Sequence, residues 1–295
     1  MLAETILKRI NHYKCTTSQE YVAALLEIIQ EIALIGLWRS KFFERAAFYG
    51  GTSLRILYGL DRFSEDLDFT LLEKSPEINL EPYKHAVVRE LHSLGFEVTL
   101  EEKVKTSNSA IRSAFIKANT KEHLLRIGLS ERDQARLHSD QILKIKLEID
   151  TDPPLNFSCE HKQLAFPGPF SVTTLSLPDL FAGKMHAMLF RDFKGWVKGR
   201  DWYDFLWFLG QGIPLNIAHL QERMRQLGHL DKNQILDEEK IKSLLIQRIS
   251  KLDIESARND VARFIKDQWK IDHWSQEYFL QSASHLKFIN ATTKK

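Results

Sequence analysis

The chain has 295 residues, of which 43% are hydrophobic and 27% are charged, and its formal net charge is +2. This composition is that of a soluble globular protein with one large or two ordinary domains. The nearly balanced charge gives no overall sign of nucleic-acid binding, although a local basic face is left open.

Two further observations bear on the compartment. The N-terminal residues lack the apolar core of a secretory signal, and no run of about 18 apolar residues is present, so we expect no membrane span. The two cysteines, Cys15 and Cys159, have no metal-ligand spacing, which fits a reducing compartment. We therefore expect a cytoplasmic enzyme or binding protein.

The first part of the chain has the periodicity of α-helices. It predicts helices over residues 2–13 and 18–46, with Ser18 as the N-cap of the second and Glu20 just after it. We interpret both as helices that pack in front of the core unit.

The stretch from Phe48 to Leu72, FYGGTSLRILYGLDRFSEDLDFTLL, organises the rest of the chain. It predicts a short strand end, a turn made by Gly50, Gly51, Thr52 and Ser53, one short helix, a polar bend and a strand over residues 67–72. The glycine turn allows close backbone approach, and the N–H groups at the start of the following helix can bind phosphate.

Two carboxylates, Asp66 and Asp68, begin that strand. Because residues two apart in a strand share a face, both side chains should project together, away from the buried Leu67 and Phe69. Carboxylates this close repel each other, and a hard cation such as Mg²⁺ or Mn²⁺ would remove the conflict by pairing them with substrate phosphates. Either half of this pattern is weak alone, whereas both together in this order are specific.

The next segment should complete a mixed sheet. The pattern predicts a helix over residues 80–94 that ends at Gly95, a hairpin of residues 96–105 and 110–118, and a loop with a short helix or edge strand over residues 121–140. Residues 142–150, ILKIKLEID, alternate strictly between apolar and charged side chains. This strand either lines a cleft or presents a solvent-facing charge ladder in which Lys146 neighbours Glu148.

Residues 151–169 are proline-rich and predict a loop and a boundary between domains 1–170 and 171–295. A helix should start at Ser176 and carry Lys184 at the edge of its apolar face, where the lysine can reach a cleft and bind a triphosphate. The basic loop from Arg191 to Arg200 is either a surface turn or an RNA-binding loop. Asp201 is expected to be the N-cap of the next helix or a salt-bridge partner. Further helices are expected over residues 217–227, 237–250, 256–269 and 274–288.

The string GGTSLR…RFSEDLDF resembles the nucleotidyltransferase signature of the polymerase-beta-like superfamily, with 12 residues between Ser53 and Asp66. More narrowly, it is similar to the AbiEii toxin family, whose usual form Arg55 and Arg62 also fit. The block from Lys184 through Asp201 to Asp204 resembles the same family. The resemblance implies an α+β fold with a polymerase-beta-like nucleotidyltransferase core, a mixed sheet flanked by helices, and a C-terminal helical domain.

The resemblance also implies site residues. Asp66 and Asp68 would hold the metal, with Glu148 as the first and Asp150 as the second candidate for a third carboxylate. Lys184 and either Asp201 or Asp204 would complete the catalytic site from the helical domain. The turn residues Gly50, Gly51, Thr52 and Ser53 would bind the nucleotide, together with Arg55 and Arg62, although such arginines are as often structural ion pairs.

The function implied is that of a metal-dependent nucleotidyltransferase toxin, neutralised by a cognate antitoxin in abortive phage infection. Relatives are associated with GTP use or with transfer of nucleotides to the 3′ end of tRNA, so a nucleoside triphosphate and an RNA acceptor are the expected partners. Two alternatives are a nucleotidyltransferase for a small molecule or protein, and a nucleotide (GTP)-binding module without turnover. An ion-pair-rich structural protein is a third.

Overall fold

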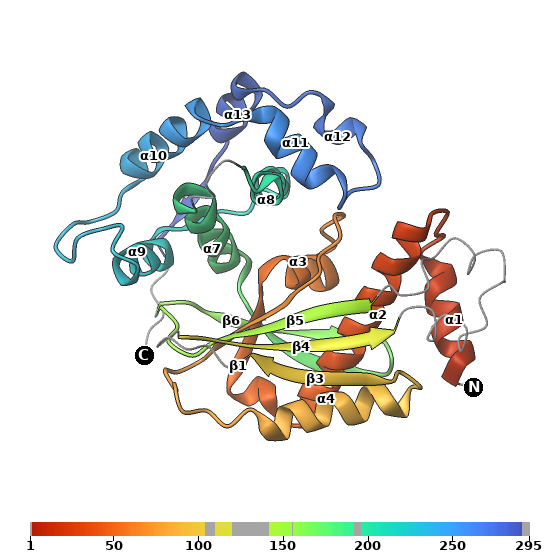
Figure 1. Cartoon of the computed structure of the whole chain (residues 1–295). Helices are drawn as coiled ribbons and strands as arrows, with labels where there is room; N and C mark the ends of the chain where they lie inside the picture. Colours follow the sequence, from red (N-terminus) through yellow and green to blue (C-terminus); the bar gives the residue numbers. More distant parts are fainter. Residues whose placement is uncertain (1, 104–109, 120–141, 155, 192–195, 291–295) are drawn as a thin grey trace. The chain divides into compact units, whose positions relative to one another are not determined.

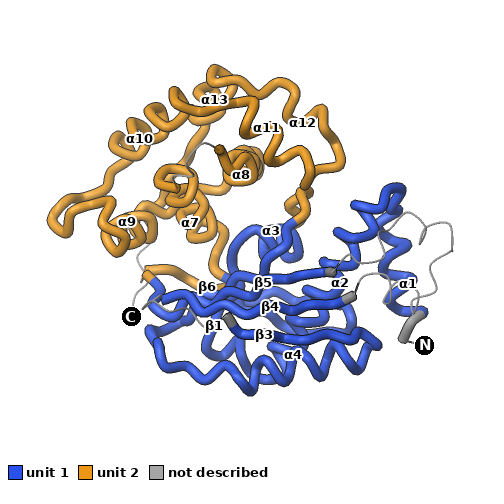
Figure 2. The backbone as a smooth tube through the Cα atoms, viewed as in Figure 1, with its two compact units in different colours: residues 1–58, 64–153, 161–174 blue, residues 59–63, 154–160, 175–295 orange. Residues whose placement is uncertain are grey.

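The computed structural model describes residues 2–103, 110–119, 142–154, 156–191 and 196–290 (Figure 1). The chain forms two compact units, coloured separately in Figure 2. The first unit consists of residues 1–58, 64–153 and 161–174, and the second consists of residues 59–63, 154–160 and 175–295. The division into domains of residues 1–170 and 171–295 stays a prediction.

The first unit begins with α1 (Leu2–His12) and α2 (Ser18–Arg39). The predicted second helix was too long, because η1 (Phe42–Glu44) and β1 (Ala46–Tyr49) occupy its last residues. Its N-cap is Thr17 rather than Ser18, since the Thr17 side chain accepts from the Glu20 N–H in a capping box.

The apolarity of α2 comes from its place in the core. By length and composition alone α2 could cross a membrane. In this unit, however, most of the helix is buried, with Ile28 and Ile32 fully enclosed among the side chains of the sheet and of α4 (Glu81–Ser93). A buried core helix needs the same residues, so α2 gives no argument for a membrane span.

Among the described residues, seven strands form one mixed sheet in the order β3-β4-β5-β2-β1-β7-β6. Their bounds, besides β1, are β2 (Leu67–Leu71), β3 (Val98–Lys103), β4 (Ile111–Asn119), β5 (Ile142–Asp150), β6 (Cys159–Leu164) and β7 (Phe170–Leu175). β2 pairs antiparallel with β1 and parallel with β5, and β1 pairs parallel with β7. This mixed sheet with flanking helices confirms the predicted fold class.

The predicted faces of the central strands are confirmed. Leu67 and Phe69 of β2 are fully buried, and the alternate residues of β5 from Leu143 to Ile149 are buried as well. The predicted helix α4, which ends before Gly95, and the hairpin of β3 and β4 are present. In Figure 1, α4 and α3 (Gly50–Tyr58) lie on opposite sides of the sheet. Residues 121–140 lie outside the described part of the chain.

The loop predicted over residues 151–169 was wrong in part, because it contains β6, and β7 starts directly after it. β6, CEHKQL, has no residue in the buried class and lies at the edge of the sheet, so no apolar alternation marks it. β7, FSVTTL, is mostly buried but carries two threonines and a serine. Its polar side chains satisfy backbone groups instead, as when Thr174 Oγ1 donates to Phe48 O at 2.8 Å.

The second unit is mainly helical, which agrees with the predicted helical C-terminal part. It contains α7 (Leu177–Phe190), α8 (Gly199–Gly210), α9 (Ile217–Gln226), α10 (Glu238–Ser250), α11 (Ile254–Ala262), α12 (Trp269–Asp272) and α13 (Gln276–Ala283). The predicted helix over residues 256–269 breaks into α11 and α12. The one over residues 274–288 stops early because β9 (Phe288–Ile289) pairs in parallel with β8 (Leu215–Asn216).

Candidate active site

The acidic pair lies where β1 ends and α3 begins. Tyr49 pairs with Asp68 across the antiparallel strands, so the next residue, Gly50, lies beside the Asp68 side chain. Gly50 has φ +86°, and a Cβ built there would overlap Asp68 Oδ2 and come within 3.0 Å of Asp68 Cγ. Only glycine fits both the backbone conformation and the space. The Asp68 carboxylate is therefore seated against the start of α3.

Hydroxyl and amide side chains fix the loop around this carboxylate. The buried Thr52 donates through Oγ1 to Asp66 O, and the buried Ser53 donates to Gly50 O at 3.0 Å. Gln30 of α2 donates to Ser64 O at 3.1 Å and to Glu65 O at 2.9 Å, which holds the chain just before Asp66. The hydroxyl of Ser53, a residue predicted to bind the nucleotide, donates inside the turn, so the backbone N–H groups are the donors suited to phosphate.

The strand register distinguishes the two candidates for a third carboxylate. Glu148 is the direct partner of Asp68 in the parallel pair of β2 and β5, whereas Asp150 is the partner of Thr70. The Glu148 carboxylate accepts from Ser113 Oγ at 3.2 Å and pairs with Lys146 at 2.7 Å. Glu148 thus lies beside Asp68. It also forms the ion pair with Lys146 that was the alternative interpretation of this strand.

Arg55 points back to the packing helices. Its Nε lies 2.6 Å from Glu27 Oε2 of α2, and both side chains are largely shielded from solvent. This contact is a structural ion pair between α3 and α2. A phosphate contact by Arg55 stays a prediction.

The donor set of the first unit fits a hard cation. Asp66 and Asp68 offer carboxylate oxygens, the kind of ligand that Mg²⁺ prefers, and Gly50 leaves room for the Asp68 carboxylate that a side chain would fill. Within the described ranges, no three Asp, Glu, His or Cys side chains lie together as a ligand set for one ion. Mg²⁺ is usually bound by one or two carboxylates and completed by water and substrate phosphates.

The remaining charged site residues lie in the second unit, centred on Asp204 of α8. Asp204 is fully buried and accepts from Arg62 Nε at 2.6 Å and from Arg62 Nη2 at 2.7 Å. Lys184 of α7 approaches the same carboxylate at 2.7 Å. Burial alone would raise the pKa of Asp204, but the charges and hydrogen bonds of Arg62 and Lys184 outweigh it and lower the pKa to about 2. Asp204 is therefore ionised at neutral pH, and both of its carboxylate oxygens already have partners.

Arg62 is itself buried, with 2% of its surface exposed. Burial lowers its pKa, but the charge and hydrogen bonds of Asp204, together with the charge of Asp201, outweigh burial and raise the pKa, so the guanidinium stays charged. Its bidentate contact with Asp204 is an ion pair internal to the second unit. A phosphate contact by Arg62 stays a prediction.

Asp201, one turn before Asp204 on α8, is held more loosely. Its Oδ2 lies 3.4 Å from Arg191 Nη1, and its Oδ1 lies 3.8 Å from Lys184 Nζ. Asp201 Oδ1 is buried and accepts no hydrogen bond from the described residues. The prediction that Asp201 is the N-cap was wrong, since the N-cap is Lys198.

Helix α11 fixes the start of α8. Asp260 of α11 accepts from the Arg200 N–H at 3.2 Å and so supplies the capping acceptor that Lys198 lacks. A Cβ on Gly199 would overlap the Ala257 carbonyl, so α8 can approach α11 only with glycine there. Burial and the cations Arg191, Lys184 and Arg200 lower the pKa of Lys198 to about 8, against the effect of Asp201.

The structure thus brings the predicted residues together as two groups. The first unit holds the turn from Gly50 to Ser53, the acidic pair and Glu148, and the second unit holds Arg62, Lys184, Asp201 and Asp204. Sequence reasoning missed Gln30 and Asp260, which position these groups. A buried glutamine in the apolar run of α2 is the one signal that could have revealed Gln30.

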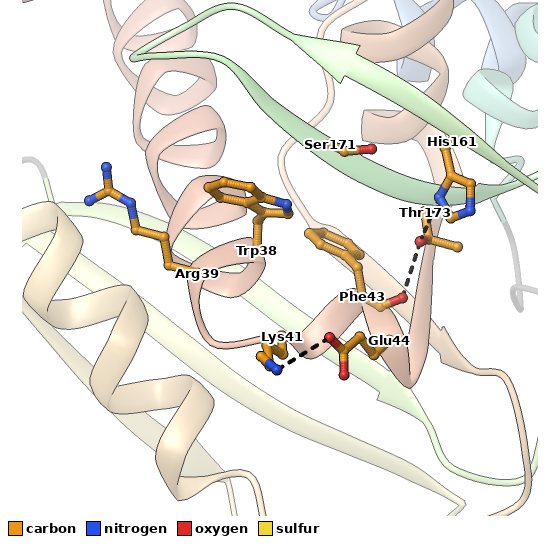
Figure 3. A pocket seen from close by; sticks show the side chains of 8 residues that line it. All are labelled: Trp38, Arg39, Lys41, Phe43, Glu44, His161, Ser171 and Thr173. Carbon is orange, nitrogen blue, oxygen red and sulfur yellow. Dashed lines mark hydrogen bonds and ion pairs between the residues drawn. The ribbon is translucent and has the colours of Figure 1, made fainter.

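One cavity of about 630 Å³ lies elsewhere on the first unit. Figure 3 shows it between the end of α2, η1, and strands β6 and β7, with Trp38, Phe43, His161 and Thr173 among its lining residues. It contains none of the predicted site residues. Its residues Phe43 and Glu44 precede β1, whereas Gly50 follows β1, so it lies at the other end of that strand from the acidic pair.

Comparisons with known proteins bear on what this arrangement is. No protein with curated annotation matches the sequence. Two solved structures are similar to this chain. JHP933 from Helicobacter pylori is 18% identical, with a TM-score of 0.49, and the match covers 89% of this chain and 90% of that one. The other structure is MenT4, a nucleotidyltransferase toxin from Mycobacterium tuberculosis. MenT4 is 16% identical with a TM-score of 0.49 over 96% of this chain and 98% of its own. Likeness this distant transfers no substrate.

The family comparison is more decisive. The family model for the nucleotidyl transferase AbiEii toxin, type IV toxin–antitoxin system, matches residues 32–281, which include both groups of site residues. The chain therefore belongs to the AbiEii family of nucleotidyltransferase toxins.

Proposed function

We propose that this nucleotidyltransferase toxin transfers a nucleoside monophosphate from a nucleoside triphosphate to a hydroxyl of an RNA acceptor, with Mg²⁺ held by Asp66 and Asp68. The proposal rests on one observation: the Asp68 carboxylate lies in close contact with Gly50, at the N-terminus of α3. Carboxylates for a cation and backbone N–H groups for phosphate therefore meet at one point of the first unit. That combination suits a metal-bound triphosphate.

Each residue has a role in this proposal. The backbone of Gly51, Thr52 and Ser53 binds outer phosphates, and Gln30 keeps the loop before Asp66 in place. When bound, the cation neutralises phosphate oxygens and favours departure of pyrophosphate. Lys184 adds a positive charge for the leaving group. Glu148, as the neighbour of Asp68 in the sheet, is the candidate to help bind a second cation or to accept the proton of the attacking hydroxyl.

The RNA acceptor is the finer part of the proposal. The sequence offers a basic segment from Arg191 to Arg200, and Trp196 within it is 43% exposed. Basic residues that neighbour an exposed aromatic residue in the sequence suit phosphate contact and base stacking. We place the reaction in the cytoplasm, where tRNA is available, and expect a cognate antitoxin because the family consists of toxin–antitoxin enzymes.

The test is transfer of label from each α-³²P nucleoside triphosphate to total tRNA in the presence of Mg²⁺. We expect labelled tRNA with one preferred base, and none with Asp66→Asn. Label that appears on protein instead would replace the RNA acceptor by a protein hydroxyl. Tight Mg²⁺-dependent binding without any transfer would favour the nucleotide-binding module, and no binding at all would refute the site.

A further inference from the structure

Two arginines of α9, Arg223 and Arg225, differ in what their guanidinium groups contact. Both side chains are half-buried, and in both the Nε atom is enclosed without an acceptor among the described residues. Arg225 compensates with its other nitrogens, because Nη1 donates to Glu222 Oε1 at 3.1 Å and Nη2 donates to Gln234 O at 2.8 Å. The Arg223 side chain makes no hydrogen bond or ion pair with the described part of the chain.

The partial burial of Arg223 makes its lack of a partner significant. Arg45 and Arg89 also have side chains without a partner among the described residues, but both are exposed, so water hydrates them. Proteins seldom keep a cation partly out of water without a counter-charge. The terminal nitrogens of Arg223, unlike its Nε, are not buried, so a ligand can reach them from solvent. The guanidinium is therefore charged, accessible and available to an anion.

The surroundings of Arg223 on α7 are positively charged as well. Its Cζ lies 3.9 Å from the place where a Cβ would stand on Gly183. Burial lowers the pKa of His186, one turn further along α7, to about 3, and the Arg223 charge is the largest of the charges that add to this effect. The charges of His229 and Arg191 act in the same direction. Arg191, Arg223 and His229 thus form a basic patch around His186.

The imidazole of His229 gives the basic patch a fixed aromatic ring. Its Nδ1 lies 3.0 Å from His186 Nε2, and its ring stacks on Phe190 with the centroids 4.2 Å apart and the planes 7° from parallel. These two contacts hold the ring in one orientation, while the residue as a whole is exposed. An aromatic ring near an arginine suits a nucleotide, because a base stacks on the ring and a phosphate pairs with the guanidinium.

An RNA strand fits the basic patch better than an acidic protein segment does. A carboxylate would satisfy Arg223 but would leave the ring of His229 unused, whereas a nucleotide carries both a phosphate and a base. Arg191 also begins the basic segment that we propose contacts RNA, so the patch extends the same surface of the second unit. A polynucleotide is long enough to lie on this unit while its end reacts elsewhere, so the contact needs no particular arrangement of the two units.

We propose that Arg223, together with Arg191, binds a backbone phosphate of the RNA acceptor and that a neighbouring base stacks on His229. The inference rests on the proposed function, because it takes the acceptor to be RNA. It assigns an RNA contact to the end of α7 and to α9, outside the residues expected to carry out the reaction.

The experiment compares Arg223→Gln with Arg225→Gln in the full chain. It measures the melting temperature and the equilibrium binding of three probes: total tRNA over a series of KCl concentrations, a nucleoside triphosphate with Mg²⁺, and polyglutamate. Arg223→Gln should weaken tRNA binding by about tenfold and make the slope of log affinity against log salt shallower by about 1. Its melting temperature and triphosphate affinity should equal those of the wild type, because the side chain has no partner in the described fold.

Arg225→Gln should show the reverse pattern. It loses the contacts with Glu222 and Gln234, so its melting temperature should fall by about 2–4 °C, while its tRNA affinity stays within about twofold of the wild type. A third variant, His229→Ala, tests the stacking contact and should weaken tRNA binding by about fivefold or more.

Several results would overturn the inference. Unchanged tRNA affinity in Arg223→Gln or in His229→Ala would do so, as would an equal loss in Arg225→Gln. Loss of triphosphate affinity in Arg223→Gln would assign the phosphate to the nucleotide instead, and an equal loss toward polyglutamate would assign the basic patch to an acidic protein. A wild type that binds no tRNA would overturn the RNA acceptor of the proposed function as well, whereas tRNA binding that Arg223→Gln leaves unchanged would overturn this inference alone.

Discussion

Substituting Gly50 by alanine should separate the geometry of the acidic pair from the general cost of a strained backbone. Gly50 has φ +86°, and an added Cβ would overlap Asp68 Oδ2. Gly95 in the same unit has φ +83°, but nothing lies within 4 Å of a Cβ built there. Gly95→Ala is therefore a matched control that carries the backbone strain without the contact with Asp68.

The two substitutions should differ in size. A non-glycine residue in the left-handed region costs about 1–2 kcal/mol, which applies to both variants. Gly50→Ala adds an overpacking term of about 1–3 kcal/mol, because either the methyl group or the Asp68 carboxylate must move. We expect a loss in the free energy of unfolding of about 1–2 kcal/mol for Gly95→Ala and of about 2–5 kcal/mol for Gly50→Ala.

The effect on the reaction should be larger still. Displacing a ligating carboxylate by about 1 Å can lower turnover by about 10²-fold. Denaturant unfolding and label transfer from a nucleoside triphosphate, measured below both transitions, give the two quantities. If the rate of label transfer by Gly50→Ala is within about threefold of the rate by Gly95→Ala, the close contact between Gly50 and the Asp68 carboxylate does not matter for the reaction, and the reasoning fails.

Three further outcomes follow from the charges. The pKa of Asp204 is 3.8 in the unfolded chain and is lowered to about 2 in the folded protein, so ionised Asp204 contributes about 2 kcal/mol to the free energy of unfolding above pH 3.8. This contribution should be lost as the pH falls from about 4 to about 2. Asp204→Asn should not show this loss of stability in acid. Lys198 belongs to the basic segment that we propose contacts RNA, and its pKa is lowered to about 8, chiefly by burial, so affinity for the RNA acceptor should weaken above about pH 8. Lys198→Arg should remove that dependence, and a wild-type affinity for RNA that does not change above about pH 8 would contradict an RNA contact by Lys198. Chelation with EDTA should abolish nucleotide binding and added Mg²⁺ or Mn²⁺ should restore it, whereas binding that survives EDTA would exclude the cation at Asp66 and Asp68.

Local sequence signals were enough for the core of the site. Alternation fixed which face of β2 and β5 is buried, because the period of a strand leaves only two choices. The order of turn, helix and strand around Gly50 predicted the elements that the structure shows as β1, α3 and β2. The resemblance to the family, rather than a local pattern, named Lys184 together with Asp201 and Asp204, which the structure brings together.

What the sequence could not give depends on contacts between distant segments. The bonding of Asp204 to Arg62 joins residues 142 apart, and no local pattern separates that saturated carboxylate from the open one of Asp201. Gln30 reaches the loop before Asp66 across the core. Strand β6 escaped notice because an edge strand with no buried residue lacks the apolar period on which strand prediction depends.

The central claim is that the acidic pair is the centre of nucleotidyl transfer. The most direct measurement is incorporation of α-³²P label into the RNA and protein of a cell extract by the wild type, by Asp68→Asn and by Asp152→Asn. Asp152 is a control carboxylate in the same unit that pairs with Lys74 at 2.5 Å. We predict label with the wild type and Asp152→Asn and none with Asp68→Asn. Undiminished label with a stably folded Asp68→Asn would contradict the account.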